Sequence, residues 1–176
     1  MLQYRKATMA DVPAIHQLIQ HWANQGVMLR RPAMRIYEAA RDFVVAVDGT
    51  TGELAGVGGL HIMGQDLAEI RSLAVQPGRV GGGVGRGLVE QLMLDAADIG
   101  LQRVFALTYQ QKFFERAGFL VVTKDSLPQK VWTECVYCDK FDHCEEIAVV
   151  RWVDPAHPDA PVVDEIPLIE KPHWGK

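Results

Sequence analysis

The stretch EIRSLAVQPGRVGGGVGRG, residues 69–87, decides the fold. Its first seven residues, 69–75, are rich in Ile, Leu and Val and predict a β-strand that Pro77-Gly78 closes. Five glycines follow, at positions 81, 82, 83, 85 and 87. Apolar residues then recur at helical spacing from Leu88 to Ile99, and Gly100 ends that run. The segment therefore predicts a strand, a glycine loop and a helix in succession.

The glycine loop predicts an anion site. Because glycines carry no side chains, the N–H groups of residues 81–86 can point into one anion at the positive end of the following helix. Phosphate or pyrophosphate is the expected ligand. The dinucleotide pattern G-x-G-x-x-G fails, since Arg86 stands where it requires glycine, and the Walker pattern fails, since no Gly-Lys-Ser/Thr occurs. A glycine turn without a ligand is the alternative.

The remaining elements surround this segment in an order typical of an α/β domain. The predicted strands cover residues 3–7, 43–47, 54–63, 69–75, 104–107, 119–122 and 147–153. The other predicted helices run from Thr8 to Gly26, through Tyr37 to Ala40, and from Lys112 to Ala117. From Asp154 onward, five of the nine prolines fall in 23 residues and predict an extended tail. We therefore expect one domain over 1–153 and a proline-rich tail over 154–176.

Composition excludes several classes of protein. With 18 Lys and Arg against 22 Asp and Glu, the net charge of −4 argues against nucleic acid or an anionic membrane as a partner. No apolar run approaches the ~18 residues of a membrane span, and no signal peptide is visible at the N-terminus. The three cysteines all lie between residues 135 and 144, which is not a secreted disulfide framework. A cytoplasmic protein is expected.

The decisive segment resembles the GNAT acyl-CoA N-acyltransferases, whose signature after a strand is Gln/Arg-x-x-Gly-x-Gly/Ala. Gly83-Val84-Gly85 supplies its second half, whereas Val80 occupies its first position and Arg79 lies one residue early. The order of elements fits over about residues 2–153. The resemblance implies an α/β GNAT fold, in which helices flank a central mixed, mostly antiparallel sheet that is splayed at strands 4 and 5. It also implies acetyl-CoA as the cosubstrate.

The resemblance implies that the pyrophosphate binds the amides of residues 81–86 and that pantetheine runs along residues 73–75. The residues expected to bind the cofactor are Leu73, Ala74, Val75, Arg79, Val80, Gly81, Gly82, Gly83, Val84, Gly85, Arg86 and Phe113.

A narrower resemblance concerns the acceptor. Residues 26–31 (GVMLRR), 69–75 and 104–108 look like amino-acid N-acetyltransferases, and more closely like the short N-acetylglutamate synthases of arginine biosynthesis. This implies transfer of acetyl to the α-amine of an amino acid, with glutamate favoured. Planar guanidinium groups are natural receptors for carboxylates. Arg30, Arg31 and Arg71, with Lys112 behind them, are therefore the expected acceptor residues, although loop arginines can also be simply solvated.

Two residues are candidates for proton transfer. Glu69 lies where a GNAT base usually lies, and its alternative role is an ordinary carboxylate paired with Arg71. A general acid is harder to assign, because the helix before Gly118-Phe119 contains no Tyr. Tyr109 is a substitute candidate, although a coenzyme A thiolate leaves readily without an acid.

Cys135, Cys138, His143 and Cys144 form a compact cluster of soft ligands. Zinc is one interpretation and a redox dithiol another, but reduced, partly buried cysteines are favoured over both. Two rival functions also stay open. One is acetylation of a different amine, such as a peptide N-terminus, a polyamine or a drug, and the other is an acyl-CoA sensor without turnover. The expected partner is a small molecule, and a homodimer is left open.

Overall fold

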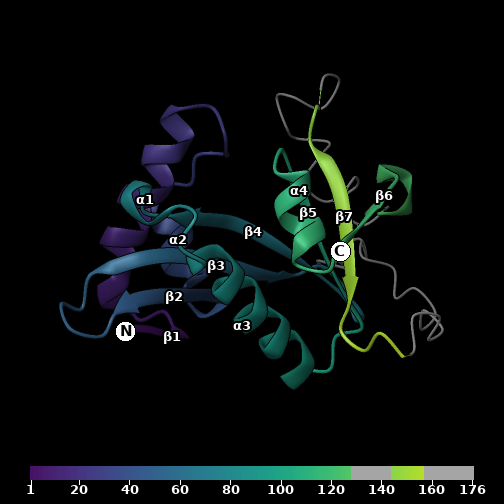
Figure 1. Ribbon diagram of the computed structural model, residues 1–176, viewed down its shortest axis with the longest axis horizontal. Helices are drawn as coiled ribbons and strands as arrows, with labels where there is room; N and C mark the ends of the chain where they lie inside the picture. The colour runs from purple at the N-terminus through teal and green to yellow at the C-terminus, as the bar shows by residue number, and fades with distance from the viewer. Residues whose placement is uncertain (128–143, 157–176) are drawn as a thin grey trace, which may run out of the picture.

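The computed structural model describes residues 1–127 and 144–156. They form a seven-stranded sheet with α3 on one face and α1 and α2 on the other (Figure 1). The strands are β1 (Leu2–Lys6), β2 (Phe43–Asp48), β3 (Leu54–Ile62), β4 (Leu67–Val75), β5 (Arg103–Thr108), β6 (Leu120–Val122) and β7 (Ile147–Trp152). The helices are α1 (Val12–Asn24), α2 (Ala33–Glu38), α3 (Val84–Asp98) and α4 (Gln111–Arg116), with single 3₁₀ turns η1 (Met9–Asp11), η2 (Ala40–Asp42), η3 (Pro77–Arg79) and η4 (Lys124–Ser126).

The sheet has the order β1-β2-β3-β4-β5-β7-β6, and only the β4–β5 pair is parallel. That pair is short, because its register covers only Leu67–Glu69 against Arg103–Phe105. Beyond Glu69 the two strands separate, and the rest of β4 is no longer paired with β5. These features confirm the architecture that the resemblance implies: a mixed, mostly antiparallel sheet that is splayed at strands 4 and 5.

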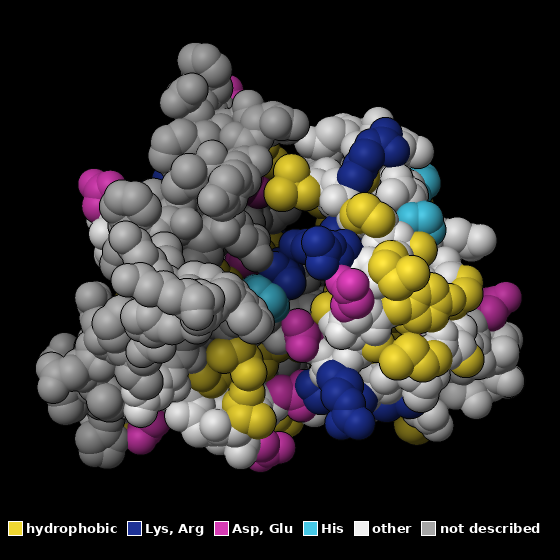
Figure 2. Space-filling model, turned by 180° about the vertical axis from the view of Figure 1, so that it is seen from behind, with side chains coloured by type: hydrophobic (Ala, Val, Ile, Leu, Met, Phe, Trp, Pro, Cys, Tyr) yellow, Lys and Arg dark blue, Asp and Glu magenta, His cyan; other side chains and the backbone are white. Residues whose placement is uncertain are grey.

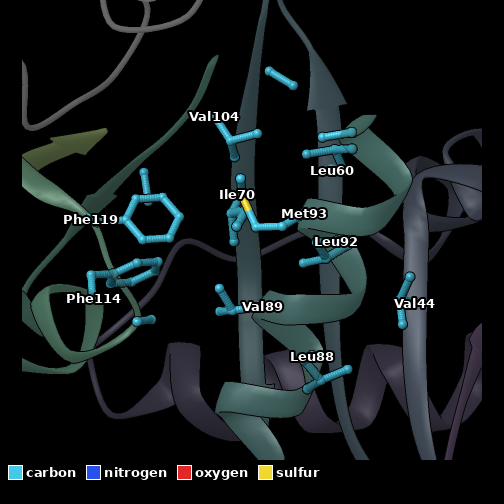
Figure 3. Packing of buried hydrophobic residues seen from close by; sticks show 14 of the residues in the cluster. Val44, Leu60, Ile70, Leu88, Val89, Leu92, Met93, Val104, Phe114 and Phe119 are labelled. Carbon is cyan, nitrogen blue, oxygen red and sulfur yellow. The ribbon is translucent and has the colours of Figure 1, made fainter. Parts of the chain in front are cut away.

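The larger core lies between α3 and the sheet (Figure 3). Leu88, Leu92 and Ala96 recur every four residues on α3, so they share one helix face and are fully buried. They pack in one cluster with Ile70 of β4 and Val104 of β5. Full burial of such a side chain stabilises the fold by about 1.5–3 kcal/mol. This packing fixes the start of α3 beside the end of β4.

The second core lies beneath α1, whose residues Val12, Ile15 and Ile19 are fully buried. The helix is preceded by a polar cap, in which the Asp11 carboxylate accepts hydrogen bonds from Thr8 N at 2.7 Å and Thr8 Oγ1 at 2.8 Å. The hydrogen bond from Arg5, followed by those from Thr8, holds the pKa of the Asp11 carboxyl well below its usual range. Trp22 Nε1 donates to Val75 O at 2.9 Å and ties α1 to the end of β4.

Helix α3 starts at Val84, four residues earlier than the sequence pattern predicts. Gly85 and Gly87 therefore belong to its first turn rather than to the loop. Both allow close packing: a Cβ on Gly85 would lie 3.3 Å from Phe113, and a Cβ on Gly87 would collide with the Tyr4 hydroxyl.

Residues 128–143 and 157–176 lie outside the described part of the chain. They include Cys135, Cys138 and His143 and most of the proline-rich tail, so the domain boundary at 153 stays a prediction. Within the described residues, every helix is too short or too polar to cross a membrane.

Candidate active site

A cleft of about 540 Å³ opens where β4 ends and α3 begins. It contains all the predicted cofactor residues except Ala74, Gly82 and Val84. Ala74 and Val84 are buried in the two cores instead. The lining residues are Leu73, Val75, Arg79, Val80, Gly81, Gly83, Gly85, Arg86, Gln110, Phe113, Arg116 and Ala117.

The glycine loop presents bare backbone to this cleft. Gly81 and Gly83 have φ values of 84° and 82°, in the left-handed region that favours glycine. Gly83 caps α3, and a Cβ on Gly81 or Gly83 would meet no atom within 4 Å. The first N–H groups of a helix have no acceptor inside it, so those of Val84, Gly85 and Arg86 can bind an anion.

Three arginines line the same cleft. Arg79 Nη2 donates to Asp48 Oδ2 at 2.9 Å. The backbone N–H of Thr50 and the Arg79 guanidinium lower the pKa of Asp48 to about 2. Arg86 and Arg116 are exposed at the rim. Sequence reasoning missed Arg116, although it lies three residues after Phe113 on the same helix face.

Arg116→Ala and Arg86→Ala are each expected to raise the KM for acetyl-CoA by about 2- to 5-fold, the scale of an exposed charge pair. The reason is that, in the cofactor site implied by the resemblance, the phosphates of coenzyme A would pass this rim. The effect should shrink as salt rises, because exposed charges are screened. Steady-state kinetics at two salt concentrations measure it. Arg41→Ala, an exposed arginine outside both cavities, is the control, and an equal effect there would contradict the assignment.

A second cavity of about 310 Å³ lies on the α2 side of the sheet. Its lining residues are Arg31, Arg35, Glu38, Ala39, Asp42, Phe43, Gly59, His61 and Arg71. Figure 2 shows the face opposite α3, where Lys and Arg side chains meet acidic and His side chains at a hollow. Gly59 pairs with Arg71 in the register and provides the floor, since a Cβ there would lie 3.1 Å from Phe43.

Ser72 lies in the chain between Arg71, which lines the second cavity, and Leu73, which lines the first. Its φ of 54° is the one positive value among the described non-glycine residues, and it coincides with a register shift between β3 and β4. This irregularity sends Arg71 to the second cavity and Leu73 to the first. Arg31 Nε donates to Ser72 Oγ at 2.8 Å, which holds Arg31 over the second cavity. Sequence reasoning missed Ser72, since a bulge leaves no pattern of its own.

The other predicted residues lie outside these linings. Arg30 is exposed and donates from Nη1 to Gln20 Oε1 at 2.9 Å. Lys112 and Tyr109 are exposed and line neither cavity. Glu69 is only 5% exposed and lies two residues before Arg71 on β4.

Cys144 is half-buried, with Sγ 3.9 Å from Glu146 Oε2. Over residues 1–127 and 144–156, no three His, Cys, Asp or Glu side chains are grouped to hold a metal ion. Since Cys135, Cys138 and His143 lie outside those ranges, the zinc interpretation is untested.

Comparisons with known proteins agree with this geometry. The Acetyltransferase (GNAT) family matches residues 12–119. An N-acetyltransferase of Chlorobaculum tepidum is 39% identical over 84% of this chain and 94% of its own. The amino-acid acetyltransferase of Mycobacterium tuberculosis is 37% identical over 85% of this chain and 83% of its own.

Among solved structures, the N-acetylglutamate synthase of Neisseria gonorrhoeae, complexed with coenzyme A and N-acetylglutamate, superposes with a TM-score of 0.76. It is 26% identical, and the match covers 88% of this chain and 35% of that one. This chain therefore belongs to the GNAT family of acetyltransferases, whose cosubstrate is acetyl-CoA.

Proposed function

We propose that this enzyme transfers acetyl from acetyl-CoA to the α-amine of an acidic amino acid, with L-glutamate as the best fit. The observation that carries the proposal is the second cavity, into which Arg31, Arg35 and Arg71 converge. A glutamate acceptor brings two carboxylates, and guanidinium groups bind carboxylates in a planar, bidentate way. The amino-acid acetyltransferase and N-acetylglutamate synthase relatives support the same acceptor and, with it, a role in arginine biosynthesis. A cytoplasmic location is part of this proposal.

The three arginines differ in their surroundings. Arg35 donates to Glu38 Oε2 at 2.8 Å and is exposed. Arg31 and Arg71 are half-buried, and Ser72 orients Arg31. Because partial burial strengthens a charge-assisted hydrogen bond, Arg31 and Arg71 are the principal receptors in this proposal.

The proposed chemistry is direct transfer in a ternary complex. Glu69 accepts a proton from the α-ammonium group, directly or through a water, and the freed nitrogen attacks the thioester carbonyl. The N–H of Leu73 or Ala74 faces the oxyanion, because β4 has left its ladder with β5 at that point. Coenzyme A then leaves as a thiolate, which takes the second proton that the acceptor nitrogen loses as it becomes an amide.

Arg71→Ala and Arg31→Ala are each expected to lower kcat/KM for glutamate by about 30- to 150-fold. This corresponds to the ~2–3 kcal/mol of a lost charge-assisted hydrogen bond. Arg30→Ala is the matched control: it removes the neighbouring arginine, which lines neither cavity, and should change kcat/KM far less. The KM for acetyl-CoA should stay constant in all three variants.

An acceptor screen on the wild-type enzyme, measured by thiol release, completes the test. Glutamate should react best, and glutamine less well, since it keeps only the α-carboxylate. If a polyamine or a peptide amine outperforms glutamate, the acidic amino acid is wrong and a different amine is the acceptor. If no amine increases thiol release, the proposed transfer is wrong and the alternative hypothesis, an acyl-CoA sensor without turnover, is favoured.

A further inference from the structure

The proposed reaction leaves a proton on a buried side chain, and this proton must reach solvent before the next turnover. When the acceptor enters as an ammonium ion and coenzyme A leaves as a thiol, one proton is released in each turnover. The proposed base, Glu69, is only 5% exposed. A carboxyl group buried to this degree needs a neighbour that takes its proton to solvent before the next cycle.

His61 has the right position to be that neighbour. In the antiparallel β3–β4 register, His61 is the direct partner of Glu69. Directly opposed residues project from the same face of a sheet, with Cβ atoms about 4.5–5.5 Å apart. The His61 side chain lines the second cavity and is 33% exposed. The imidazole therefore lies between a buried carboxylate and water.

Asp42 orients the imidazole from the other side. His61 Nδ1 lies 3.3 Å from Asp42 Oδ2, and Asp42 is 34% exposed. A hydrogen bond from Nδ1–H to this carboxylate leaves the lone pair on Nε2, because a neutral imidazole has one donor and one acceptor nitrogen. The carboxylate also stabilises the imidazolium that forms when Nε2 takes a proton.

The remaining charges of the cavity favour onward release. Arg31 and Arg71 face it from the loop before α2 and from β4, and Arg35 and Glu38 face it as an ion pair on α2. The positive charges of these arginines disfavour a lasting imidazolium in the same cavity, so His61 passes its proton to water.

We infer that His61 is a positioning residue that relays the acceptor's proton from Glu69 to solvent, with Asp42 orienting its ring. The inference rests on the proposed function in taking Glu69 as the first proton acceptor. An N–H bond of the ammonium breaks, and its proton forms an O–H bond on Glu69. That proton then moves to His61 Nε2 and finally to a water molecule, which restores both groups.

His61→Gln tests the relay, since it keeps a polar side chain and removes the titratable ring. The expected result is a kcat about 10- to 100-fold lower near neutral pH, which is less than the ~10²–10⁴-fold loss of a general base. The KM values for both substrates should stay within about 2-fold of wild type. The deficit should shrink at high pH, where the acceptor arrives already deprotonated.

Three further measurements separate a relay from a structural role. Free imidazole should restore turnover to His61→Ala, because the site is open to solvent. In the Glu69→Gln background, His61→Gln should cost almost nothing more, since the two residues act in one chain. Asp42→Asn should lower kcat by only about 3- to 10-fold, well below the ~10²–10⁴-fold of a general acid or base, because Asp42 only orients the ring. His21→Gln, on the exposed side of α1, is the control.

The outcomes are distinct. Unchanged kcat and pH profile in His61→Gln would overturn the relay, and so would a raised amino-acid KM at constant kcat or full additivity with Glu69→Gln. If the wild-type enzyme does not acetylate glutamate, the proposed acceptor is wrong. The same measurements with whichever amine is acetylated then still test the role of His61. If Glu69→Gln has wild-type kinetics, the base has failed, and a kcat loss in His61→Gln alone would make His61 the first acceptor and overturn the relay order.

Discussion

Gly83→Val should abolish measurable acetyl-CoA binding, a loss of at least about 100-fold in Kd or some 2.7 kcal/mol. Gly83 caps α3 with a φ of 82°, and a side chain there would enter open space of the cleft. That space lies in front of the first N–H groups of α3, where we place the pyrophosphate. A branched side chain would block the phosphate and also disfavour the left-handed backbone. Titration calorimetry with coenzyme A measures the effect.

Gly100→Val is the matched control. Gly100 lies just past the other end of α3, has a φ of 80° and would place its Cβ in open space. The backbone strain is therefore similar, about 1–2 kcal/mol, and both variants should lose stability in thermal unfolding. Only Gly83→Val should lose coenzyme A affinity. A folded Gly83→Val protein that binds coenzyme A as tightly as wild type would contradict the phosphate cradle.

Much of the fold could be predicted because its signals are local. The apolar residues of α1 recur at helical spacing, and Phe43–Val47 is a continuous apolar run that contains three β-branched valines. The glycine segment at residues 81–87 predicts a transition from a strand to a helix. The exact start of α3 could not be predicted, since it depends on Gly85 packing under Phe113 and Gly87 packing against Tyr4, residues far away in the sequence.

The acceptor side of the site shows a similar division. Arg31 and Arg71 carry a signal in the sequence, because paired arginines and an arginine in an apolar strand are unusual. His61 and Asp42 carry none, since they meet only through the β2–β3–β4 register and the turn before β2. Likewise, the insertion of β7 between β5 and β6 depends on long-range pairing that no local pattern encodes.

Glu69→Gln is expected to lower kcat by about 10²–10⁴-fold at neutral pH, the usual loss for a general base. Glutamine keeps the size and hydrogen-bonding capacity of the side chain but cannot take the ammonium proton. The burial of Glu69 leaves little room for bulk water to replace it. The α-ammonium group of a free amino acid is more basic than a peptide N-terminus, which titrates near pH ~8, so the acceptor becomes deprotonated only at distinctly higher pH, and the deficit should narrow there. The pH dependence of kcat and kcat/KM measures both effects.

Glu53→Gln is the control, since Glu53 is an exposed carboxylate in the hairpin between β2 and β3, outside the strand that carries Glu69 and Arg71. It should leave the pH profile unchanged. A Glu69→Gln enzyme with a wild-type profile would remove Glu69 from proton transfer, and a loss below about 10-fold would reduce it to an electrostatic role. A loss of kcat that stays constant with pH would indicate that Glu69 acts on the oxyanion rather than on the amine. The slope of the deficit against pH is therefore the measurement that distinguishes a base on β4 from a carboxylate that only supports Arg71.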